Sequence, residues 1–296
     1  MAQNLFSQLM ALNDAAQSRD NYVRAAFGYP GAKSRSIQNL LSILEYRKVW
    51  VDVYAGCGAV TLARNSSDLE VMNDRHAGIT AFFRVIRDKE KCQQFIDRMQ
   101  FTVCSREEFL WSRENWPDPQ IDDVERAARW YYCVQHSFAS KGWSFGRVTS
   151  GRSQCEKIFN NLELLWPIHN RLRRVYIENA DWRVLLKDYN TERNGDNIVW
   201  YLDPPYWMTG GIYDHEMRPE VHYEIGERCM HLNGFVALSG YDHPRHPYNS
   251  FKWDRKESWE VQVSMTGMAF TDTNHLAEYS DIIERGKAKE TVWIRS

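Results

Sequence analysis

The clearest candidates for chemistry are Asp203, Pro204, Pro205 and Tyr206, which follow the apolar run at 198–202. This run predicts a buried strand, and ligands of open α/β sheets bind beyond the carboxyl ends of strands. Proline fixes its φ angle and donates no hydrogen bond, so this turn can hold the Pro204 carbonyl beside the Asp203 carboxylate. Two adjacent acceptors suit a planar amine, and Tyr206 offers a ring on which a base can stack. The alternative interpretation is an ordinary strand end with a Pro-Pro stop.

A second candidate site lies at 52–64, where Gly56 and Gly58 follow another apolar run. Glycines let a turn approach a ligand closely and pass into a helix N-terminus. A dinucleotide site would have a third glycine at position 61, but Thr61 stands there, which disfavours a pyrophosphate and favours a nucleoside. Asp74 ends the next predicted strand, where a carboxylate can accept hydrogen bonds from ribose hydroxyls. A tight turn followed by a surface acid is the alternative.

A parallel sheet is needed to bring such strand ends together, and the order of the predicted elements supplies one. We expect helices at 4–25, 37–47, 59–65 and 218–234, the last opening with Pro219 and closing at Gly234. We expect strands at 48–58, 68–74, 174–181, 197–203, 235–241, 258–265, 280–286 and 290–296. Residues 78–172 have a helical pattern rich in Arg and Trp, too long for a plain loop. The predicted organisation is an N-terminal helical segment (1–25), an α/β domain (26–77 and 173–296) and an inserted lobe (78–172).

Several further segments make the chain resemble the Dam-type DNA adenine methyltransferases, which use S-adenosylmethionine. The resemblance spans most of the chain and rests on FGYPGAKSR (27–35), DVYAGCG (52–58), VMND (71–74), ENADW (178–182) and DPPY (203–206). YDHEM (213–217) and GFVALSGYD (234–242) resemble a subgroup common in phages and prophages. Two departures stand out: Ala32 replaces the usual second glycine of the first segment, and Val53-Tyr54 replaces the commoner Pro-Phe.

The resemblance implies a Rossmann-like methyltransferase fold with a mixed, mostly parallel sheet and an inserted helical target-recognition lobe. It implies catalytic roles for Asp203, Pro204, Pro205 and Tyr206, and cofactor contacts from Tyr29, Lys33, Gly56, Gly58, Asp74, Asp181 and Trp182. Tyr29 and Lys33 would hold the methionine end of S-adenosylmethionine, Asp74 its ribose and Asp181 its adenine amine. The alternatives are a solvated loop lysine at position 33, a helix cap at position 181 and a core aromatic residue at position 182.

The implied reaction is methyl transfer to the exocyclic amine of adenine in duplex DNA, after the base has been flipped out. The same chemistry on cytosine or RNA remains open, as does a catalytically silent DNA-binding relative. The polar loop at 137–152 is the predicted DNA contact. Its cations, Lys141, Arg147 and Arg152, suit phosphates, and its aromatic residues, Trp143 and Phe145, suit the gap left by the flipped base. A polar loop without a partner is the alternative.

Composition adds limits to this interpretation. The net charge is −2, so any DNA must be held by local patches and not by a global positive field. The six cysteines contain no C-x-x-C pair, which argues against a zinc ribbon or a disulfide scaffold and fits a reducing cytosol. The histidines show no metal-binding spacing, so we expect no metal. Without a signal sequence or a run of about 18 apolar residues, we expect no membrane span. We further expect no membrane partner and a monomeric enzyme in the cytoplasm of a bacterial host. A cognate restriction enzyme as partner is left open.

Overall fold

The protein is divided into two compact units. The computed structural model describes residues 22–146, 154–207, 217–262 and 287–296. The helical unit takes its described residues from 1–34, 56–64 and 76–179, and the sheet unit takes them from 35–55, 65–75 and 180–296. The predicted helix at 4–25 falls mostly outside the described residues, and the predicted strand at 280–286 lies wholly outside them.

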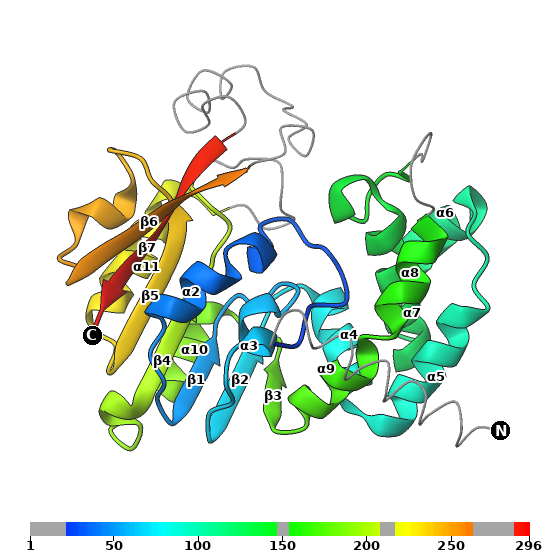
Figure 1. Ribbon diagram of the computed structural model, residues 1–296, viewed down its shortest axis with the longest axis horizontal. Helices are drawn as coiled ribbons and strands as arrows, with labels where there is room; N and C mark the ends of the chain where they lie inside the picture. Colours follow the sequence, from blue (N-terminus) through cyan, green and yellow to red (C-terminus); the bar gives the residue numbers. More distant parts are fainter. Residues whose placement is uncertain (1–21, 147–153, 208–216, 263–286) are drawn as a thin grey trace. The chain divides into compact units, whose positions relative to one another are not determined.

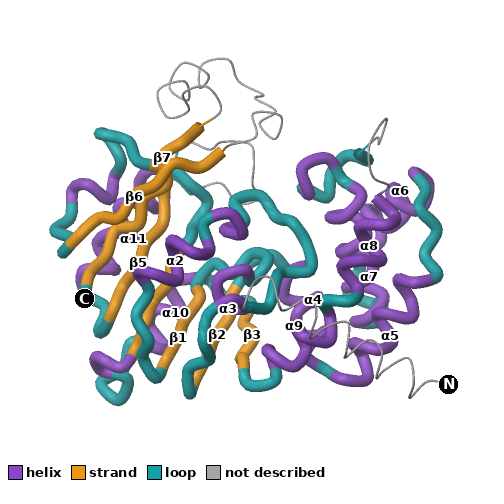
Figure 2. The backbone as a smooth tube through the Cα atoms, viewed as in Figure 1, coloured by secondary structure: helices purple, strands orange, loops and turns teal. Residues whose placement is uncertain are grey.

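The central feature is a seven-stranded sheet with the order β3-β2-β1-β4-β5-β7-β6 (Figure 1). Figure 2 shows its strands in orange. Its strands are β1 (Val49–Asp52), β2 (Leu69–Asn73), β3 (Val175–Glu178), β4 (Ile198–Leu202), β5 (Phe235–Tyr241), β6 (Arg255–Gln262) and β7 (Lys287–Arg295). β1 pairs in parallel with β2 and β4, and β4 pairs in parallel with β5. β7 is antiparallel to both β5 and β6. This arrangement confirms the predicted α/β class with a mixed, mostly parallel sheet.

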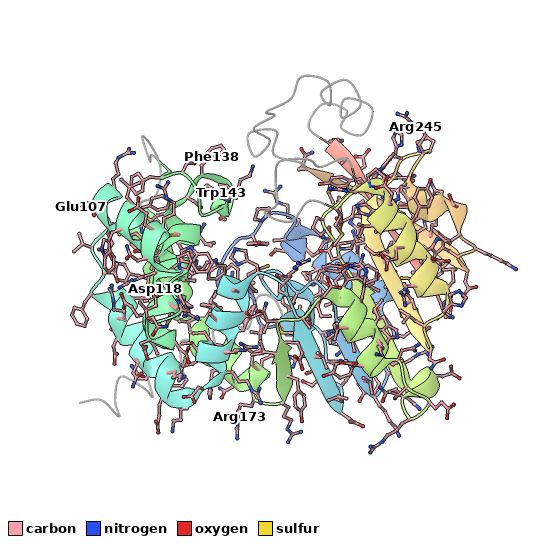
Figure 3. The ribbon with its side chains drawn as sticks, turned by 180° about the vertical axis from the view of Figure 1, so that it is seen from behind. Glu107, Asp118, Phe138, Trp143, Arg173 and Arg245 are labelled. Carbon is pink, nitrogen blue, oxygen red and sulfur yellow. A yellow bond between two sulfur atoms is a disulfide. The ribbon has the colours of Figure 1, made fainter. Side chains whose placement is uncertain are left out.

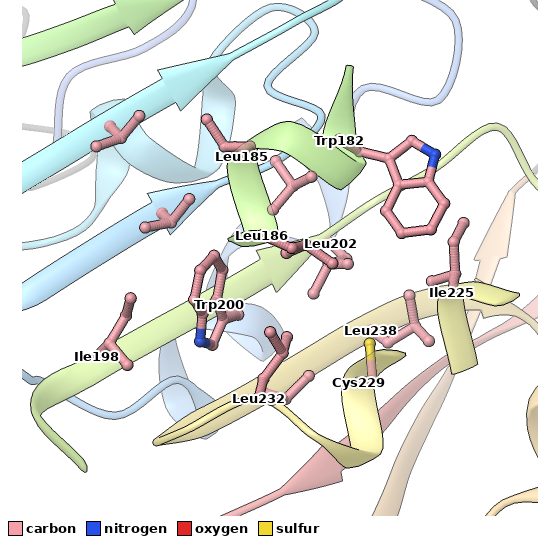
Figure 4. Close-up of a cluster of buried hydrophobic side chains, with 14 of the residues drawn as sticks. Trp182, Leu185, Leu186, Ile198, Trp200, Leu202, Ile225, Cys229, Leu232 and Leu238 are labelled. Atoms are coloured by element: carbon pink, nitrogen blue, oxygen red, sulfur yellow. The ribbon is translucent and has the colours of Figure 1, made fainter. Parts of the chain in front are cut away.

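The parallel strands at the centre of the sheet are buried on both faces. Every residue of β1 and β4 is buried, as expected when helices cover both sides of a parallel sheet. On one face, Trp200 and Leu202 of β4 pack in a cluster with Leu186 of α10 (Trp182–Tyr189) and Cys229 of α11 (Pro219–Met230) (Figure 4). Helix α2 (Ile37–Ile43) lies over the opposite face (Figure 1). Burying a large apolar side chain contributes about 1.5–3 kcal/mol, so this cluster fixes the positions of the strands.

Helix α11 begins where the sequence indicated but ends at Met230, before the predicted end at Gly234. Pro219 occupies its first turn, where the missing N–H costs nothing. After the helix, Gly234 adopts a φ of 75°, and a Cβ at this position would lie 2.3 Å from the Ile198 carbonyl oxygen. Only glycine therefore allows the chain to turn at this point into β5.

The helical unit contains six longer helices in its described part. These are α4 (Ala77–Arg87), α5 (Lys89–Gln100), α6 (Arg106–Asn115), α7 (Asp123–His136), α8 (Gln154–Leu162) and α9 (Leu165–Leu172). Asp88, Ser105 and Asp122 cap α5, α6 and α7 by accepting hydrogen bonds from first-turn amides. In the core, the rings of Phe82 and Tyr131 stack at 5.3 Å, and Phe82 also packs edge-to-face on Phe95. The predicted helical character of this part of the chain is thus observed.

The helix predicted at 37–47 is also shorter in the structure. The helix expected at 37–47 ends at Ile43, because Leu44 is extended, with φ −79° and ψ 125°. The following residues make tertiary contacts that a helix would prevent. The Arg47 carbonyl accepts from Ser67 Oγ at 2.7 Å, and the Arg47 guanidinium donates to the Asp196 carbonyl. Helical spacing alone did not reveal these competing contacts.

The cysteines depart from the sequence-based expectation at one point. Cys104 and Cys155, which are 51 residues apart, form a disulfide within the helical unit. One bridge is not a disulfide scaffold, but the scattered spacing gave no sign of it. Cys92, Cys133 and Cys229 are buried, and burial raises the pKa of each thiol to about 12. Among the described helices, none is both long enough and apolar enough to cross a membrane.

Candidate active site

The carboxyl ends of β1 and β4 are adjacent in the sheet unit, where the strand order reverses. The two strands stay in register up to Asp52 and Tyr201, and the Val53 amide donates to the Tyr201 carbonyl at 2.9 Å. The chain therefore leaves both strands at the same edge, through residues 53–55 and 203–207. In doubly wound sheets, a ligand binds at this switch point.

The turn after β4 holds an acid and an aromatic residue in fixed positions. Asp203 and Tyr206 are partly buried, and Pro204 between them is buried. The Tyr206 ring lies edge-on to the Tyr241 ring, with 4.6 Å between centroids. Its hydroxyl donates to Glu290 Oε1 at 3.1 Å. Both ends of the Tyr206 side chain are thus fixed by contacts within the sheet unit.

Burial and Asp203 both raise the pKa of the neighbouring tyrosines, Tyr206 and Tyr201. Burial raises the pKa of Tyr206 well above its usual value, and the negative charges of Asp203 and Glu290 raise it further. The pKa of Tyr201 in β4 is also raised, first by burial and then by Asp203. Both phenols are therefore protonated at neutral pH and remain hydrogen-bond donors.

Trp207, which the sequence analysis did not select, forms the other end of the turn. Its ring centroid lies 5.3 Å from that of His243 and 5.3 Å from that of His246. Burial lowers the pKa of His246 to about 3 and that of His222 to about 4, and His222 Nδ1 is 2.8 Å from the Tyr248 hydroxyl. His222 and His246 are thus neutral at physiological pH, and they pack with the rings of Trp207 and Tyr248 beside the turn. The aromatic residue directly after DPPY was the signal that could have identified Trp207.

Asn73 links three chain segments at the same edge of the sheet, and it too was missed. Its Nδ2 donates to the Val53 carbonyl at 2.9 Å and to the Ala180 carbonyl at 3.2 Å, while its Oδ1 accepts from the Ala180 amide at 2.9 Å. It is buried as the last residue of β2. The partly buried Asp74, the predicted ribose acceptor, follows it directly. Asn73 thereby fixes the backbone from which both Asp74 and Asp181 project.

Asp181 is a helix cap, which is one of the two roles that the sequence left open. Its Oδ1 accepts from the Arg183 amide at 2.9 Å, at the start of α10, and its Oδ2 lies 3.5 Å from Arg75 Nη1. The Arg183 guanidinium also pairs with Glu224 and covers the Trp182 ring at 4.5 Å. Trp182 itself is 5% exposed and belongs to the core cluster (Figure 4). Capping occupies one carboxylate oxygen of Asp181 and leaves its cofactor role a prediction.

The N-terminal motif folds as a tight turn in the helical unit. The Ala32 amide donates to the Tyr29 carbonyl at 2.9 Å, and Gly31 has a φ of 77°. With Pro30 and Gly31 as its two central residues, this is a type II turn, which needs positive φ only at Gly31. The departure at Ala32 is therefore compatible with the turn. Lys33 is 5% exposed and its Nζ donates to the Gly31 carbonyl at 2.8 Å, so it is not a solvated loop lysine.

The glycines after β1 adopt conformations that other residues rarely take. Gly56 has a φ of 53° and Gly58 a φ of 72°, and Gly58 is the N-cap of the short helix α3 (Ala59–Ala63). A Cβ added at Gly56 would lie 3.5 Å from Tyr29 Cδ1, so Gly56 and Tyr29 are neighbours. Thr61 is fully buried inside α3. The structure therefore brings the predicted residues Tyr29 and Gly56 together within the helical unit.

A small hairpin follows α7 in the helical unit. Ser137 and Phe145 form an antiparallel bridge, the Gly146 amide donates to the His136 carbonyl at 2.7 Å, and the Gly142 amide donates to Ser137 Oγ at 2.7 Å. These bonds confirm the predicted hairpin character in the described part of 137–152. The predicted contacts Arg147 and Arg152 lie outside the described residues.

The aromatic residues of this hairpin fall into two groups. Phe145 is anchored, since its ring packs on Phe109 at 5.5 Å and the Arg106 guanidinium lies 5.0 Å above it. Trp143 is 60% exposed and Phe138 is 50% exposed (Figure 3). Lys141 lies between these two in the sequence and is partly exposed. Phe138 is a further exposed aromatic residue that the sequence analysis did not select.

The comparison with protein families agrees with this arrangement. Residues 29–256 match the model of the D12 class N6 adenine-specific DNA methyltransferases. The chain therefore belongs to this family of DNA-modifying enzymes, and the mixed, mostly parallel sheet described above agrees with an α/β methyltransferase fold. The match supports adenine over the cytosine and RNA alternatives. No curated protein matches the chain.

Proposed function

We propose that the protein transfers a methyl group from S-adenosylmethionine to the exocyclic amine of a flipped adenine in duplex DNA, with the turn 203–206 as the catalytic element. The observation that carries this proposal is the position of Asp203 at the carboxyl edge of β4, beside the end of β1. Asp203 follows a fully buried strand, and Tyr206 behind it is fixed by Tyr241 and Glu290. Chemistry that depends on positioning needs this kind of preorganisation.

The residues present fit the proposed cofactor. Gly56 and Gly58 keep a close backbone approach open, because both have positive φ and lack a side chain. Tyr29 and Lys33 would hold the methionine end, with the Lys33 ammonium on the carboxylate. Asp74 would accept from the ribose and Asp181 from the adenine amine, beside the packed Trp182. When bound, S-adenosylmethionine supplies an electrophilic methyl group.

The chain's own role at the reacting nitrogen is to hold its hydrogens. The Asp203 carboxylate and the Pro204 carbonyl would accept one N–H each, and this favours a pyramidal nitrogen whose lone pair is available for attack. Pro205 continues the constrained turn, and Tyr206 would stack on the target base. No covalent bond between protein and substrate is needed, so catalysis consists of positioning and electrostatics.

The hairpin of the helical unit is the proposed DNA contact. Lys141, Arg147 and Arg152 would neutralise phosphates, which makes binding dependent on salt. Exposure favours Trp143, together with Phe138, for the space left by the flipped base, whereas Phe145 would support the hairpin from below. We also propose that the protein acts as a monomer in the cytoplasm.

Substitution of Asp203 tests the catalytic role. We expect Asp203→Ala to retain the fold and to lower turnover by at least ~10²-fold, the usual cost of losing one preorganised polar contact. The measurement is transfer of a labelled methyl group to DNA, with the melting temperature as the check on folding. Glu260→Ala, at an exposed carboxylate of β6, is the matched control. Turnover near the wild-type value in Asp203→Ala would refute the proposed mechanism.

A further inference from the structure

Glu290 is a buried carboxylate that contacts the catalytic turn from a distant part of the sequence. It is 4% exposed and lies on β7. Its Oε1 accepts from the Tyr206 hydroxyl at 3.1 Å, and its Oε2 accepts from Ser36 Oγ at 2.7 Å. Burying a carboxylate is costly unless hydrogen bonds compensate, and each oxygen of Glu290 has such a bond.

The register of the sheet explains why Glu290 meets Tyr206. Glu290 pairs with Tyr241 on β5 and with Trp259 on β6. Tyr241 supports the Tyr206 ring edge-on, and the Trp259 indole Nε1 donates to Ser36 Oγ at 3.0 Å. The two cross-strand neighbours of Glu290 thus contact the same two residues that it binds itself. The resulting network joins Trp259, Ser36, Glu290 and Tyr206, and closes through Tyr241.

The backbone of the turn cannot fix the orientation of the Tyr206 side chain by itself. Pro204 and Pro205 restrict the main chain, but they leave the two side-chain torsions of Tyr206 to be fixed by its surroundings. A hydrogen bond to a buried carboxylate is stronger than one between neutral groups and has a definite direction. It fixes the plane of the ring before substrate arrives, which lowers the ordering cost of binding.

We infer that Glu290, held by Ser36, is a positioning residue for methyl transfer, which acts by fixing the Tyr206 ring against which the target base stacks. The inference rests on the proposed function, since it requires Tyr206 to carry the base. It adds two supporting residues, Glu290 and Ser36, which would act through the Tyr206 ring and not by contact with the substrate.

A double-mutant cycle tests the inference. Tyr206→Phe removes only the hydroxyl, and Glu290→Ala removes the acceptor. The single-turnover rate of methyl transfer to unmethylated duplex DNA is measured in the wild type, both single variants and the double variant. We expect Glu290→Ala to lower this rate roughly tenfold, and to lower it no further in the Tyr206→Phe background, because the hydroxyl is then absent. Equal losses in both backgrounds, or no loss in either, would overturn the inference.

Conservative variants keep the test decisive if Glu290→Ala does not fold. Glu290→Gln retains an acceptor for Tyr206 and should restore the rate to within about threefold of the wild type. Ser36→Ala removes the second hydrogen bond, and its smaller effect should also vanish in the Tyr206→Phe background. Glu260→Ala, which loses only the exposed pair with Lys287, should leave the rate unchanged in both backgrounds.

Unfolding experiments on the same variants test whether the hydrogen bond between Tyr206 and Glu290 exists, separately from its role in methyl transfer. Non-additive shifts of the denaturation midpoint in the cycle report the hydrogen bond itself, independently of activity. A wild-type protein that transfers no methyl group to any DNA would refute the proposed function and the positioning role together. An active wild type with additive rate losses would refute the inference alone.

Discussion

The turn after β4 and the hairpin after α7 both present aromatic side chains, but they hold them differently. Tyr206 is fixed by the ring of Tyr241 and the carboxylate of Glu290. In the hairpin, Trp143 is held through its backbone, whose carbonyl accepts from Arg113 at 2.9 Å, and its side chain is 60% exposed. One aromatic residue is fixed in place by side-chain contacts, and the other is presented to solvent.

This difference corresponds to the two tasks in the proposed function. Holding an amine for attack requires fixed geometry, and small displacements are costly there. Contact with a duplex requires exposed cations and aromatic surface, which gain their partners only in the complex. Substitutions in the turn should therefore change chemistry and local stability, and substitutions at the hairpin tip should change DNA binding.

The largest expected effect is a loss of folding stability at low pH, caused by the buried His222 near the turn after β4. The pKa of His222 is about 4 in the folded protein, below the ordinary value of 6.5, so the unfolded chain binds more protons between these two values. The free energy of unfolding is therefore fully retained above pH 6.5 and falls as the pH drops towards 4. His222 contributes on the order of 3 kcal/mol to this loss. Urea unfolding at a series of pH values measures it.

A pair of histidine variants makes this prediction specific. His222→Asn should reduce the pH dependence of the unfolding free energy, while the part due to the buried His246 remains. His231→Asn, at an exposed histidine just after the same helix, is the matched control and should leave the pH dependence unchanged. An unchanged slope in His222→Asn would show that the buried imidazole does not couple proton binding to folding.

Next in size is the effect of the exposed tryptophan of the hairpin. Trp143→Ala should raise the dissociation constant for duplex DNA roughly tenfold, within the range for loss of one stacking contact, and leave the melting temperature unchanged. Phe145→Ala is the informative comparison, because this ring packs on Phe109 and its loss should lower the melting temperature. Fluorescence anisotropy and thermal melting measure the two quantities. If both variants change DNA binding and melting temperature in the same way, Trp143 and Phe145 do not have the different roles proposed for them.

The smallest expected effect concerns a single cation. Lys141→Ala should weaken DNA binding about equally across sequences and reduce the slope of log K against log salt by about 0.9, if one phosphate contact is lost. Titrations at several salt concentrations give the slope. Lys89→Ala, at an exposed lysine of α5, serves as the control for the loss of one charge. A slope equal to that of the wild type in Lys141→Ala would remove Lys141 from the interface.

Much of the fold could be predicted because the strands carry their own signal. The apolar runs at 198–202 and 235–241 are observed as β4 and β5, and Pro219 and Gly234 mark the limits of α11 and its turn. Register was not predictable. The sequence around Glu290 does not indicate that it pairs with Tyr241 and Trp259, because cross-strand partners depend on the register of the whole sheet.

The candidate site was predictable to a similar extent. DPPY and the glycine loop are local motifs; DPPY directly follows β4, and the glycines come shortly after β1 in the chain. The supporting residues were not accessible in this way. Asn73 bonds to Val53 and to Ala180, which lies 107 residues further along the chain, and Trp207 contacts histidines that follow β5. Such contacts arise only after folding, so short-range patterns cannot reveal them.

The most direct test of the central claim is a comparison of DNA from a methylation-free host that expresses either the wild-type protein or Asp203→Ala. Modified nucleosides are identified after digestion, and their positions in the genome are mapped. We predict N6-methyladenine in one sequence context with the wild type, and a loss of at least ~10²-fold with Asp203→Ala at equal protein level. Methylation of another base, or equal methylation by both proteins, would contradict the assignment of the turn 203–206 as the catalytic element for adenine methylation.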